Sequence, residues 1–466
     1  MKQWKKWLAL SLVSSGICMM GLPVPVDGHG RPSAGVGAGC ADFAPAEAAQ
    51  NKAIAAQAMA GPVQVTGVAR VYGDGEKIAA AVLEYSSPLA ADAVSPAAFA
   101  AEGKKIAAAY VSDAPDTLAK SREGRYVVLE FANENTTYDG DLSKKPGRPQ
   151  QAQTPRNGDA PKESNRKLPD LSLSVRQTLP LTATDGSVFA PSAESLSSVQ
   201  TLEPELAQFE QLTYTDPATG LSMPYNLYLP QDYDSTKKYP LLVFIPDASA
   251  NINDARTPLF QGNGATVWIS PEEQAKHECI VLAPQYTADL VKSIGMMTTD
   301  ENIWTPGLSL VSGLLFDAVQ RYSVDESRIY GTGQSQGGMA NIAISDRYPD
   351  FFAGQFLVAC QWNVKEMEAI KDKNLWILVC EGDTKAFPGM NEATARWESL
   401  GSKVARNEEF WDSKAPLAEI NAKTKELMAQ NAAINYTVFK DGNHMYTWSF
   451  AYNIESIRDW LFRQRK

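Results

Sequence analysis

The chain has 466 residues, of which 44% are hydrophobic and 21% charged, and its formal net charge is −11. This composition is that of a globular protein with room for one large domain and a smaller one. The acidic balance, and the lack of any run of basic residues interleaved with aromatic ones, argue against nucleic acid or an anionic membrane as the main partner.

Residues 1–28 have the pattern of a secretory signal peptide. A basic start, "MKQWKK", precedes the apolar stretch "WLALSLVSSGICMMGL", which is short for a membrane span and is interrupted by serine and glycine. We therefore expect a secreted or otherwise extracytoplasmic protein, with cell-envelope association left open and with no stable membrane insertion after the signal is removed. An uncleaved N-terminal anchor is the alternative interpretation.

The next part of the chain is predicted to be a linker followed by a small β-domain. Residues 29–62 are rich in Ala, Gly and Pro, which is typical of a flexible linker. Within residues 63–204, short apolar runs such as "GRYVVLEF" alternate with turn signals such as "GDG", and this spacing favours a β-sandwich. Residues 133–170 are polar and rich in proline, so they are predicted to be a disordered insertion in this domain.

Residues 205–466 are predicted to form an α/β domain. Continuous apolar runs such as "YPLLVFIP", "ECIVLAP" and "LWILVC" alternate with segments that place apolar residues at helical spacing, such as "LSLVSGLLFDAVQRY". Fully apolar strands separated by helices are typical of a mostly parallel sheet that is covered by helices on both faces.

One short stretch of this domain concentrates small residues around a single hydroxyl. In "YGTGQSQGGMA", Gly333, Ser335 and Gly337 form a G-x-S-x-G motif between a predicted strand and a predicted helix. A nucleophilic serine at such a turn has strained backbone angles, and the flanking glycines allow strand and helix to pack closely around it. The motif predicts that Ser335 is a nucleophile and that the backbone N–H of Gln336 faces the developing oxyanion.

The partners of this serine are predicted from their order along the chain. Only three histidines occur: one lies in the linker, His277 precedes a predicted strand, and His444 follows the last predicted strand. Because α/β-hydrolases order their triad as serine, acid and histidine, His444 is the predicted general base. Asp383 ends a predicted strand between the two and is the predicted acid, with Glu381 and Glu366 as alternatives.

The rest of the expected site comes from loops at the sheet's C-terminal edge. A second oxyanion N–H normally belongs to the loop after an early strand, here "VFIPDASAN". Pro246 has no N–H, so the predicted donor is the backbone N–H of Ala248. Aromatic residues in the neighbouring segments are candidates for a substrate pocket, although core packing explains each one equally well: Trp304, Trp362, Phe387 and Trp448.

No organic cofactor and no metal ion is expected. The cysteines show no C-x-x-C spacing, so the sequence has no recognisable zinc motif. Cys360 and Cys380 end two apolar segments, which leaves a disulfide and a pair of buried free thiols both open. The geometry of parallel strands favours the free thiols.

The motifs resemble those of α/β-hydrolase esterases related to polyhydroxybutyrate depolymerase-like and prolyl-oligopeptidase-like enzymes. The segments "DESRIYGTGQSQGGMANIAISDRYPDFFAG", "VCEGDTKAFPGM" and "NHMYTWSFAYNIESIRDWLF" carry this resemblance. The segment "VTGVARVYGDGEKIAAAVLEY" is similar to the immunoglobulin-like (Ig-like) domain before the catalytic domain of some extracellular bacterial esterases. The resemblance implies an α/β-hydrolase domain behind an Ig-like β-sandwich, a triad of Ser335, Asp383 and His444, and carboxylesterase activity on short acyl esters.

Two other functions are left open by the sequence. A serine peptidase of the prolyl-oligopeptidase-like type would use the same triad, although the N-terminal part is too short for a propeller. A degenerate hydrolase could serve as a binding module, because "VFIPDASAN" departs from the usual His-Gly motif of the oxyanion loop. The expected partner is a small-molecule or polymeric ester. The oligomeric state is open, and the Ig-like domain is a candidate for mediating assembly.

Overall fold

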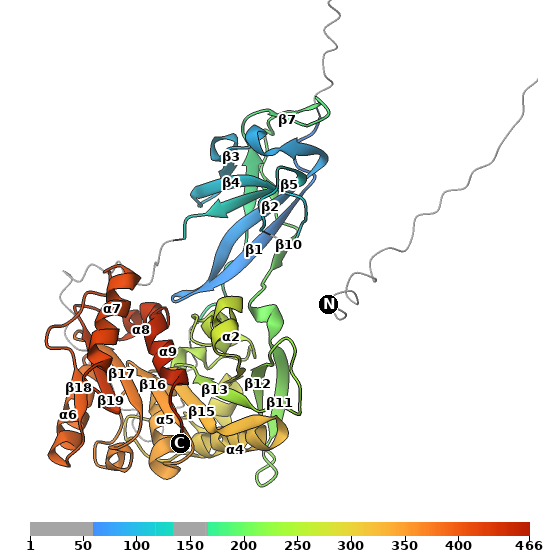
Figure 1. Cartoon of the computed structure of the whole chain (residues 1–466). Helices are drawn as coiled ribbons and strands as arrows, with labels where there is room; N and C mark the ends of the chain where they lie inside the picture. Colours follow the sequence, from blue (N-terminus) through green and yellow to red (C-terminus); the bar gives the residue numbers. More distant parts are fainter. Residues whose placement is uncertain (1–58, 117, 134–163, 165) are drawn as a thin grey trace, which may run out of the picture. The chain divides into compact units, whose positions relative to one another are not determined.

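The computed structural model describes residues 59–116, 118–133, 164 and 166–466 (Figure 1). The predicted signal peptide, most of the predicted linker and most of the predicted insertion lie outside the described residues. Within the described ranges, no helix combines the length and the apolar character that a membrane crossing requires.

The N-terminal part of the described chain is built from short strands (Figure 1). Its largest sheet has the order β10-β1-β2-β5-β4, a second sheet has the order β3-β6-β9, and β7 pairs with β8. The strands are β1 (Gln64–Tyr72), β2 (Gly75–Ala90), β3 (Phe99–Ala101), β4 (Ile106–Ser112), β5 (Glu123–Phe131), β6 (Ser174–Gln177), β7 (Leu181–Thr182), β8 (Val188–Phe189), β9 (Leu196–Ser197) and β10 (Gln200–Leu202).

A row of apolar cross-strand pairs forms the core of this domain. Val65 on β1 pairs with Leu83 on β2, Leu83 pairs with Val127 on β5, and Val127 pairs with Val111 on β4. All four side chains are fully buried, and they share one core with Val175 of the second sheet. Two sheets that pack their apolar faces together make a sandwich, so the predicted Ig-like β-sandwich is confirmed.

A nine-stranded sheet with the order β11-β12-β14-β13-β15-β16-β17-β19-β18 forms the second domain. β11 and β12 run antiparallel to their neighbours, and every other pairing is parallel. The strands are β11 (Glu210–Thr215), β12 (Ser222–Tyr228), β13 (Tyr239–Ile245), β14 (Ile280–Pro284), β15 (Val324–Gln334), β16 (Gly354–Val358), β17 (Leu375–Cys380), β18 (Val404–Arg406) and β19 (Ile434–Phe439).

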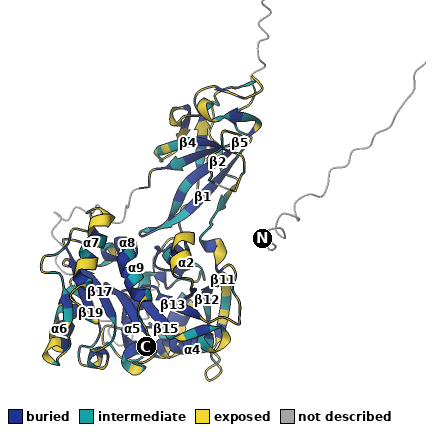
Figure 2. Ribbon diagram, viewed as in Figure 1, coloured by how far each residue is buried: buried dark blue, intermediate teal, exposed yellow. Residues whose placement is uncertain are grey.

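Helices cover both faces of this sheet, and the burial pattern of β13 shows why. Leu241, Val243 and Ile245 face a core with the helices α3 (Ala288–Ile294), α4 (Pro306–Arg321), α5 (Gln336–Arg347) and α6 (Ala386–Ser399). Leu242 and Phe244 face a core with α1 (Thr257–Phe260), α7 (Leu417–Met428), α8 (His444–Ala451) and α9 (Glu455–Phe462). Successive side chains of a strand point to opposite faces, so a strand covered on both sides is apolar throughout. Figure 2 shows the strands buried and the outer faces of helices such as α2 and α7 exposed. The predicted α/β-hydrolase fold class is confirmed.

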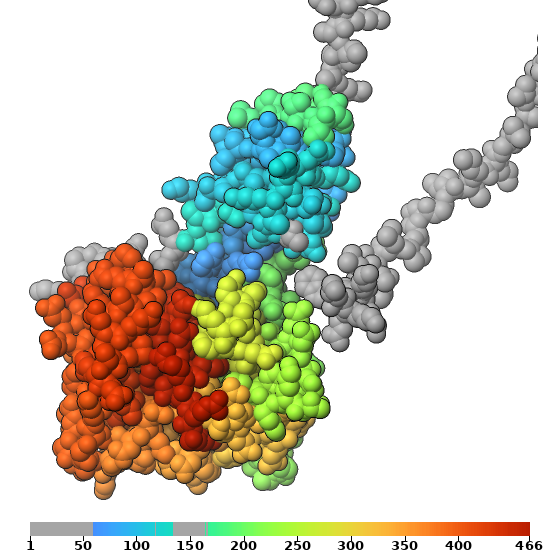
Figure 3. Space-filling model, in the orientation of Figure 1, coloured from blue at the N-terminus to red at the C-terminus, as the bar shows by residue number. Residues whose placement is uncertain are grey.

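The helices α1–α7 lie in the connections between the parallel strands, and α8 and α9 follow the last strand. The helices of this domain are α1 (Thr257–Phe260), α2 (Pro271–Lys276), α3 (Ala288–Ile294), α4 (Pro306–Arg321), α5 (Gln336–Arg347), α6 (Ala386–Ser399), α7 (Leu417–Met428), α8 (His444–Ala451) and α9 (Glu455–Phe462). The helices α2 and α9 lie side by side at the surface (Figure 3), where Arg458 donates hydrogen bonds to Glu273.

The cysteines in the described ranges are buried free thiols: Cys279, Cys360 and Cys380. Cys360 and Cys380 therefore form no disulfide, and burial raises the pKa of the Cys380 thiol to about 12. A thiol that stays protonated at neutral pH is a poor nucleophile, so neither residue competes with the serine motif as a reactive centre.

Candidate active site

Ser335 stands at a sharp turn between β15 and α5. Its backbone has φ 50° and ψ −120°, a conformation that is uncommon for any residue other than glycine. The Ser335 N–H donates a hydrogen bond to the carbonyl of Val358 on the neighbouring strand β16, at 3.1 Å, which holds the turn against the sheet. This geometry is that of the nucleophile elbow, in which the hydroxyl is presented above the edge of the sheet.

The glycines around the elbow are required by close backbone contacts. A Cβ atom on Gly337 would lie 1.8 Å from the carbonyl oxygen of Ile245, and one on Gly333 would lie 2.4 Å from the same oxygen. A Cβ on Gly338 would lie 2.5 Å from the sulfur of Cys360. The start of α5 therefore packs directly on β13 and on the segment after β16, as the motif predicts.

His444 bridges the serine and an aspartate. Its Nε2 atom lies 2.8 Å from Ser335 Oγ, and its Nδ1 atom lies 2.6 Å from Asp383 Oδ2. His444 is the first residue of α8, and Asn443 caps this helix by accepting a hydrogen bond from the N–H of Tyr446 at 3.0 Å. The structure thus brings together three residues that are far apart in sequence, at the C-terminal ends of β15, β17 and β19.

Asp383 is held as a buried carboxylate. Its side chain is 1% exposed, whereas the side chain of His444 is 38% exposed. Its Oδ1 atom accepts hydrogen bonds from the N–H groups of Lys385 and Ala386 at 3.1 and 3.0 Å. Burial by itself raises the pKa of Asp383, but the hydrogen bond and charge of His444 and the two backbone N–H groups outweigh burial and hold the pKa below its usual value.

The alternative acids contact other groups. Glu381 is exposed, and its Oε1 atom accepts a hydrogen bond from the N–H of Asp441 at 2.7 Å. Glu366 accepts a hydrogen bond from the indole N–H of Trp362 at 3.0 Å. Of the three carboxylates that the sequence offered, Asp383 is the one bonded to His444.

Two backbone segments meet beside the serine. Gln336 is the first residue of α5, so its N–H has no acceptor within its own helix. Ala248 begins the short 3-10 helix Ala248–Ala250 directly after β13, and Asp247 caps this turn. The side-chain amide of Asn251, at the end of the same turn, donates to Gln336 Oε1 at 3.3 Å, which ties the loop to the start of α5.

A buried polar network, which the sequence alone did not predict, supports this loop. Asp247 is 4% exposed; its Oδ1 atom accepts from the N–H of Ser249 at 2.8 Å, and its Oδ2 atom accepts from Gln334 Nε2 at 3.1 Å. Gln334 Oε1 in turn accepts from the hydroxyl of Tyr452 at 2.8 Å. The available signal was a polar residue close to the C-terminal end of a strand: Asp247 lies two residues after β13, and Gln334 is the last residue of β15.

The four predicted pocket aromatics have different surroundings. The ring of Trp448 lies edge-on to the ring of His444, with centroids 5.2 Å apart. Phe387 is half-buried in the first turn of α6, where its N–H donates to the carbonyl of Asp383 at 3.2 Å. Trp362 is 3% exposed and packs in the core. Trp448 therefore lies next to His444, although it is also buried in a core. The ring of Phe387 packs edge-on to Phe410, and Trp362 has the core role that the sequence left open.

Trp304 packs against the C-terminal end of α5. Its ring packs under the guanidinium of Arg347, 4.4 Å from the centroid, and edge-on to Tyr348. Both partners are at the C-terminal end of α5, whereas Ser335 precedes the N-terminal end. A helix of 12 residues is about 18 Å long, so Trp304 is remote from the hydroxyl.

A hollow adjoins the loop that carries His444. It has a volume of about 180 Å³ and is lined by residues 412–414, residues 440–443 and Tyr446. Because its lining contains lysine, aspartate and hydroxyl groups, it suits a polar part of a ligand better than an aliphatic chain.

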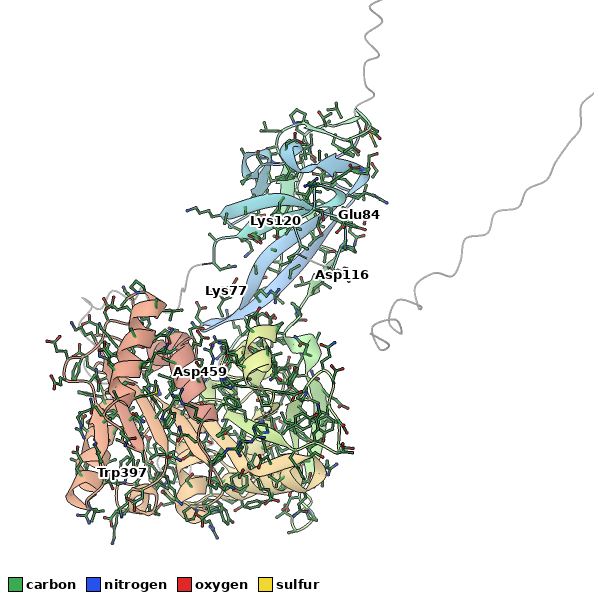
Figure 4. The ribbon with its side chains drawn as sticks, viewed as in Figure 1. Lys77, Glu84, Asp116, Lys120, Trp397 and Asp459 are labelled. Carbon is green, nitrogen blue, oxygen red and sulfur yellow. The ribbon has the colours of Figure 1, made fainter. Side chains whose placement is uncertain are left out.

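One group of metal-type ligands occurs in the described part of the chain. Glu273, His277 and Asp459 place ligand atoms within 4.8 Å of one another on α2, its end and α9. Asp459 is labelled in Figure 4. His277 Nε2 lies 2.8 Å from Asp459 Oδ1, and its ring stacks on Phe462. Glu273 Oε2 accepts from two nitrogens of Arg458 at 3.1 and 3.0 Å. These contacts pair His277 with Asp459 and Glu273 with Arg458, so we assign them a role in joining α2 to α9.

Comparisons with known proteins agree with this architecture. Residues 64–190 match the family described as the esterase Ig-like N-terminal domain. The crystal structure of a thermostable esterase aligns with a TM-score of 0.68 and 23% identity, and the alignment covers 87% of this chain and 100% of that chain. Across most of their length the two chains therefore share a fold, Ig-like domain included.

Other solved structures are similar over a smaller part. The feruloyl esterase module from Clostridium thermocellum, complexed with sinapinate, aligns with a TM-score of 0.39 and 16% identity over 56% of this chain and 90% of that one. A ferulic acid esterase from Anaeromyces mucronatus aligns with a TM-score of 0.34 and 14% identity over 53% of this chain and 88% of that one. No curated protein sequence matches the chain significantly.

Proposed function

We propose that this protein is an exported serine carboxylesterase. The observation that carries the proposal is the continuous hydrogen-bonded chain from Ser335 Oγ through His444 to Asp383, with the serine on a strained elbow. The match of residues 64–190 to a domain of esterases, and the fold shared with a thermostable esterase, support the choice of esters as substrates. A binding module would not need the bonded chain.

In the proposed reaction, Ser335 Oγ attacks the ester carbonyl while His444 Nε2 accepts the hydroxyl proton. Asp383 keeps the proton of Nδ1 on the far side of the ring and stabilises the imidazolium that forms. The N–H groups of Gln336 and Ala248 donate to the oxyanion of the tetrahedral intermediate. His444 then gives its proton to the departing alcohol, and an acyl-enzyme remains on Ser335.

Water completes the cycle by the same steps. His444 Nε2 takes a proton from a water molecule as its oxygen attacks the acyl carbonyl, and the second oxyanion uses the same two N–H groups. When this intermediate collapses, the proton returns to Ser335 Oγ and the carboxylic acid leaves. Each bond made to the serine is thus broken again, and no group beyond the three side chains and the backbone donors is required.

We propose short acyl esters as the substrate class. Trp448 is a large apolar side chain whose ring lies edge-on to His444, and it can confine a small acyl or alcohol group beside the proposed base. The proposed export rests on the pattern of residues 1–28, and N-terminal sequencing of the protein recovered from the culture medium tests it.

The deciding experiment compares esters with amides. We expect turnover of p-nitrophenyl acetate and butyrate, weaker turnover of the octanoate, and no turnover of a peptide p-nitroanilide by the full chain. A serine-directed organophosphonate should abolish the activity, and mass spectrometry should locate it on Ser335. Cleavage of the amide at a rate comparable to that of the ester would favour the serine peptidase, and labelling without any turnover would favour the binding module.

A further inference from the structure

The loop after β13 is held by residues that precede the α/β domain. Ser249 has three polar groups, and each is engaged. Its N–H donates to Asp247 Oδ1 at 2.8 Å, its hydroxyl accepts from Arg166 Nη1 at 2.7 Å, and its carbonyl accepts from Ser164 Oγ at 2.6 Å. A serine with every polar group bonded has little freedom to rotate, and Ser249 directly follows Ala248, whose N–H we assign to the oxyanion.

Arg166 makes a second contact that fixes its own position. Its Nη2 atom donates to the carbonyl of Gln261 at 2.8 Å, so the guanidinium joins two separate segments of the α/β domain. Two hydrogen bonds from one planar guanidinium constrain its orientation more than a single ammonium contact would.

Charge also connects this arginine to the loop. Burial lowers the pKa of Arg166 from its usual value, and the negative charge of Asp247 acts in the opposite direction. Asp247 is itself almost fully buried. A buried carboxylate is costly unless hydrogen bonds and a nearby cation compensate it, and Arg166 supplies that cation while Gln334 and the Ser249 N–H supply hydrogen bonds.

We infer that Arg166 is a positioning residue for the oxyanion loop Asp247–Ser249, so that a residue from outside the α/β domain helps to set the alignment of the Ala248 N–H. The kinetic test of this inference rests on the proposed function, because it measures ester hydrolysis. An oxyanion donor is effective only when it is aligned before the reaction begins, and a displacement of about 1 Å can cost on the order of a hundredfold in rate. Because the donor acts on the intermediate, its misalignment lowers kcat more than it raises KM.

The test uses the full chain with Arg166→Met, which keeps a long apolar stem and removes the donors and the charge. On p-nitrophenyl acetate we expect kcat to fall by roughly 10- to 100-fold with KM changed by less than about threefold. Arg166→Lys keeps the charge but cannot make both hydrogen bonds, so its loss should be smaller. Low, non-denaturing guanidinium chloride should partly restore the Arg166→Met enzyme and leave the wild type unchanged.

Arg176→Met is the matched control, because Arg176 is an exposed arginine on β6 of the same domain. Its kinetic constants should equal those of the wild type. If Arg166→Met and Arg166→Lys both keep kcat within twofold of the wild type, the inference is wrong while the proposed function stands. If either variant fails to fold, the other decides.

A second readout does not depend on activity. Amide hydrogen exchange of the segment around residues 247–251 should be faster in Arg166→Met than in the wild type and in Arg176→Met, because the loop has lost its anchor. Unchanged exchange there would overturn the inference even if the wild type hydrolysed no ester. A wild type without esterase activity but with faster exchange in the variant would overturn the proposed function and leave the positioning role intact.

Discussion

Ser335, His444 and Asp383 divide the proposed chemistry according to their surroundings. The serine takes its position from a strained backbone, the histidine is partly exposed so that it can exchange protons with substrate and water, and the aspartate is buried and kept ionised by donors on three sides. Each residue is thus placed where its role requires it, and single substitutions test the roles separately.

Replacement of the proposed nucleophile is the first test at this scale. Ser335→Ala should lower kcat on p-nitrophenyl acetate by about a millionfold, as for triad serines in other hydrolases, and should leave the circular dichroism spectrum unchanged. Steady-state kinetics with enzyme purified free of host esterases provides the measurement. Retention of more than a tenth of the wild-type turnover would mean that another residue is the nucleophile.

The acid is tested by a matched pair of neutral replacements. Asp383→Asn removes the acceptor that fixes the tautomer of His444, so kcat should fall by roughly ten-thousandfold. Glu381→Gln should have a small effect, because Glu381 bonds the N–H of Asp441 and does not contact His444. The two kcat values, measured at one pH, decide the assignment; the reverse order would move the role to Glu381.

At the scale of the elements, the two ends of α5 have different surroundings. Its N-terminal end approaches β13 so closely that only glycine fits, and it presents the Gln336 N–H beside the serine. Its C-terminal end carries Asp346, whose two carboxylate oxygens have no hydrogen-bond partner among the described residues. A carboxylate at the C-terminal end of a helix is also disfavoured by the helix dipole.

Asp346 predicts a pH-dependent stability. Burial, and then the charge of Glu366, raise its pKa from 3.8 to about 8. Between roughly pH 4 and pH 8 the folded state therefore holds a proton that the unfolded state has released, so this group makes the free energy of unfolding fall as pH rises. Asp346→Asn removes this effect. The free energy of unfolding of the variant should therefore exceed that of the wild type by an amount that grows with pH and reaches about 2–4 kcal/mol at pH 9.

Urea unfolding of both proteins at pH 5 and pH 9 measures the difference. Asp350→Asn is the control, since Asp350 pairs with Lys373 at the surface and its pKa is lowered, which keeps it ionised throughout this range. An Asp346→Asn protein with the same change in stability between the two pH values as the wild type would contradict the prediction.

At the scale of the whole molecule, the question is whether the Ig-like part affects the chemical step. The sequence suggests a division of labour, because the β-sandwich contains no candidate nucleophile, base or acid. The hydrogen bonds of Ser164 and Arg166 to Ser249 argue against a strict division. They connect residues that precede the α/β domain to the loop that carries a proposed oxyanion donor.

A chain shortened to begin near Glu205 distinguishes these two views. The sequence alone predicts that such a chain, if folded, hydrolyses p-nitrophenyl acetate as fast as the full protein. The positioning role of Arg166 predicts instead a kcat reduced by at least as much as in Arg166→Met, while organophosphonate labelling of Ser335 persists. Circular dichroism establishes folding first, and equal kcat values for a folded short chain would support the division of labour.

The sequence by itself determined the class of both domains and two of the three bonded residues, Ser335 and His444. Continuous apolar strands, the G-x-S-x-G motif, and a histidine after the last strand are local patterns, and local patterns are readable from one chain. The scarcity of histidine made His444 the obvious candidate for the general base. The sequence favoured Asp383 over Glu381 as the acid but did not decide between them. Both residues follow the same strand, and the sequence does not show which of the two side chains points toward His444.

Only the tertiary structure decided what depends on packing between distant segments. It placed Trp304 at the C-terminal end of α5 and Trp362 in the core. The sequence could not distinguish these positions, because aromatic residues in a pocket and in a core are of the same types and differ only in their neighbours. The tertiary structure also paired Gln334 with Asp247, and Arg166 with Ser249, across 87 and 83 residues of sequence. Such contacts leave no periodicity or spacing in the chain, so the supports of the loop could be found only in three dimensions.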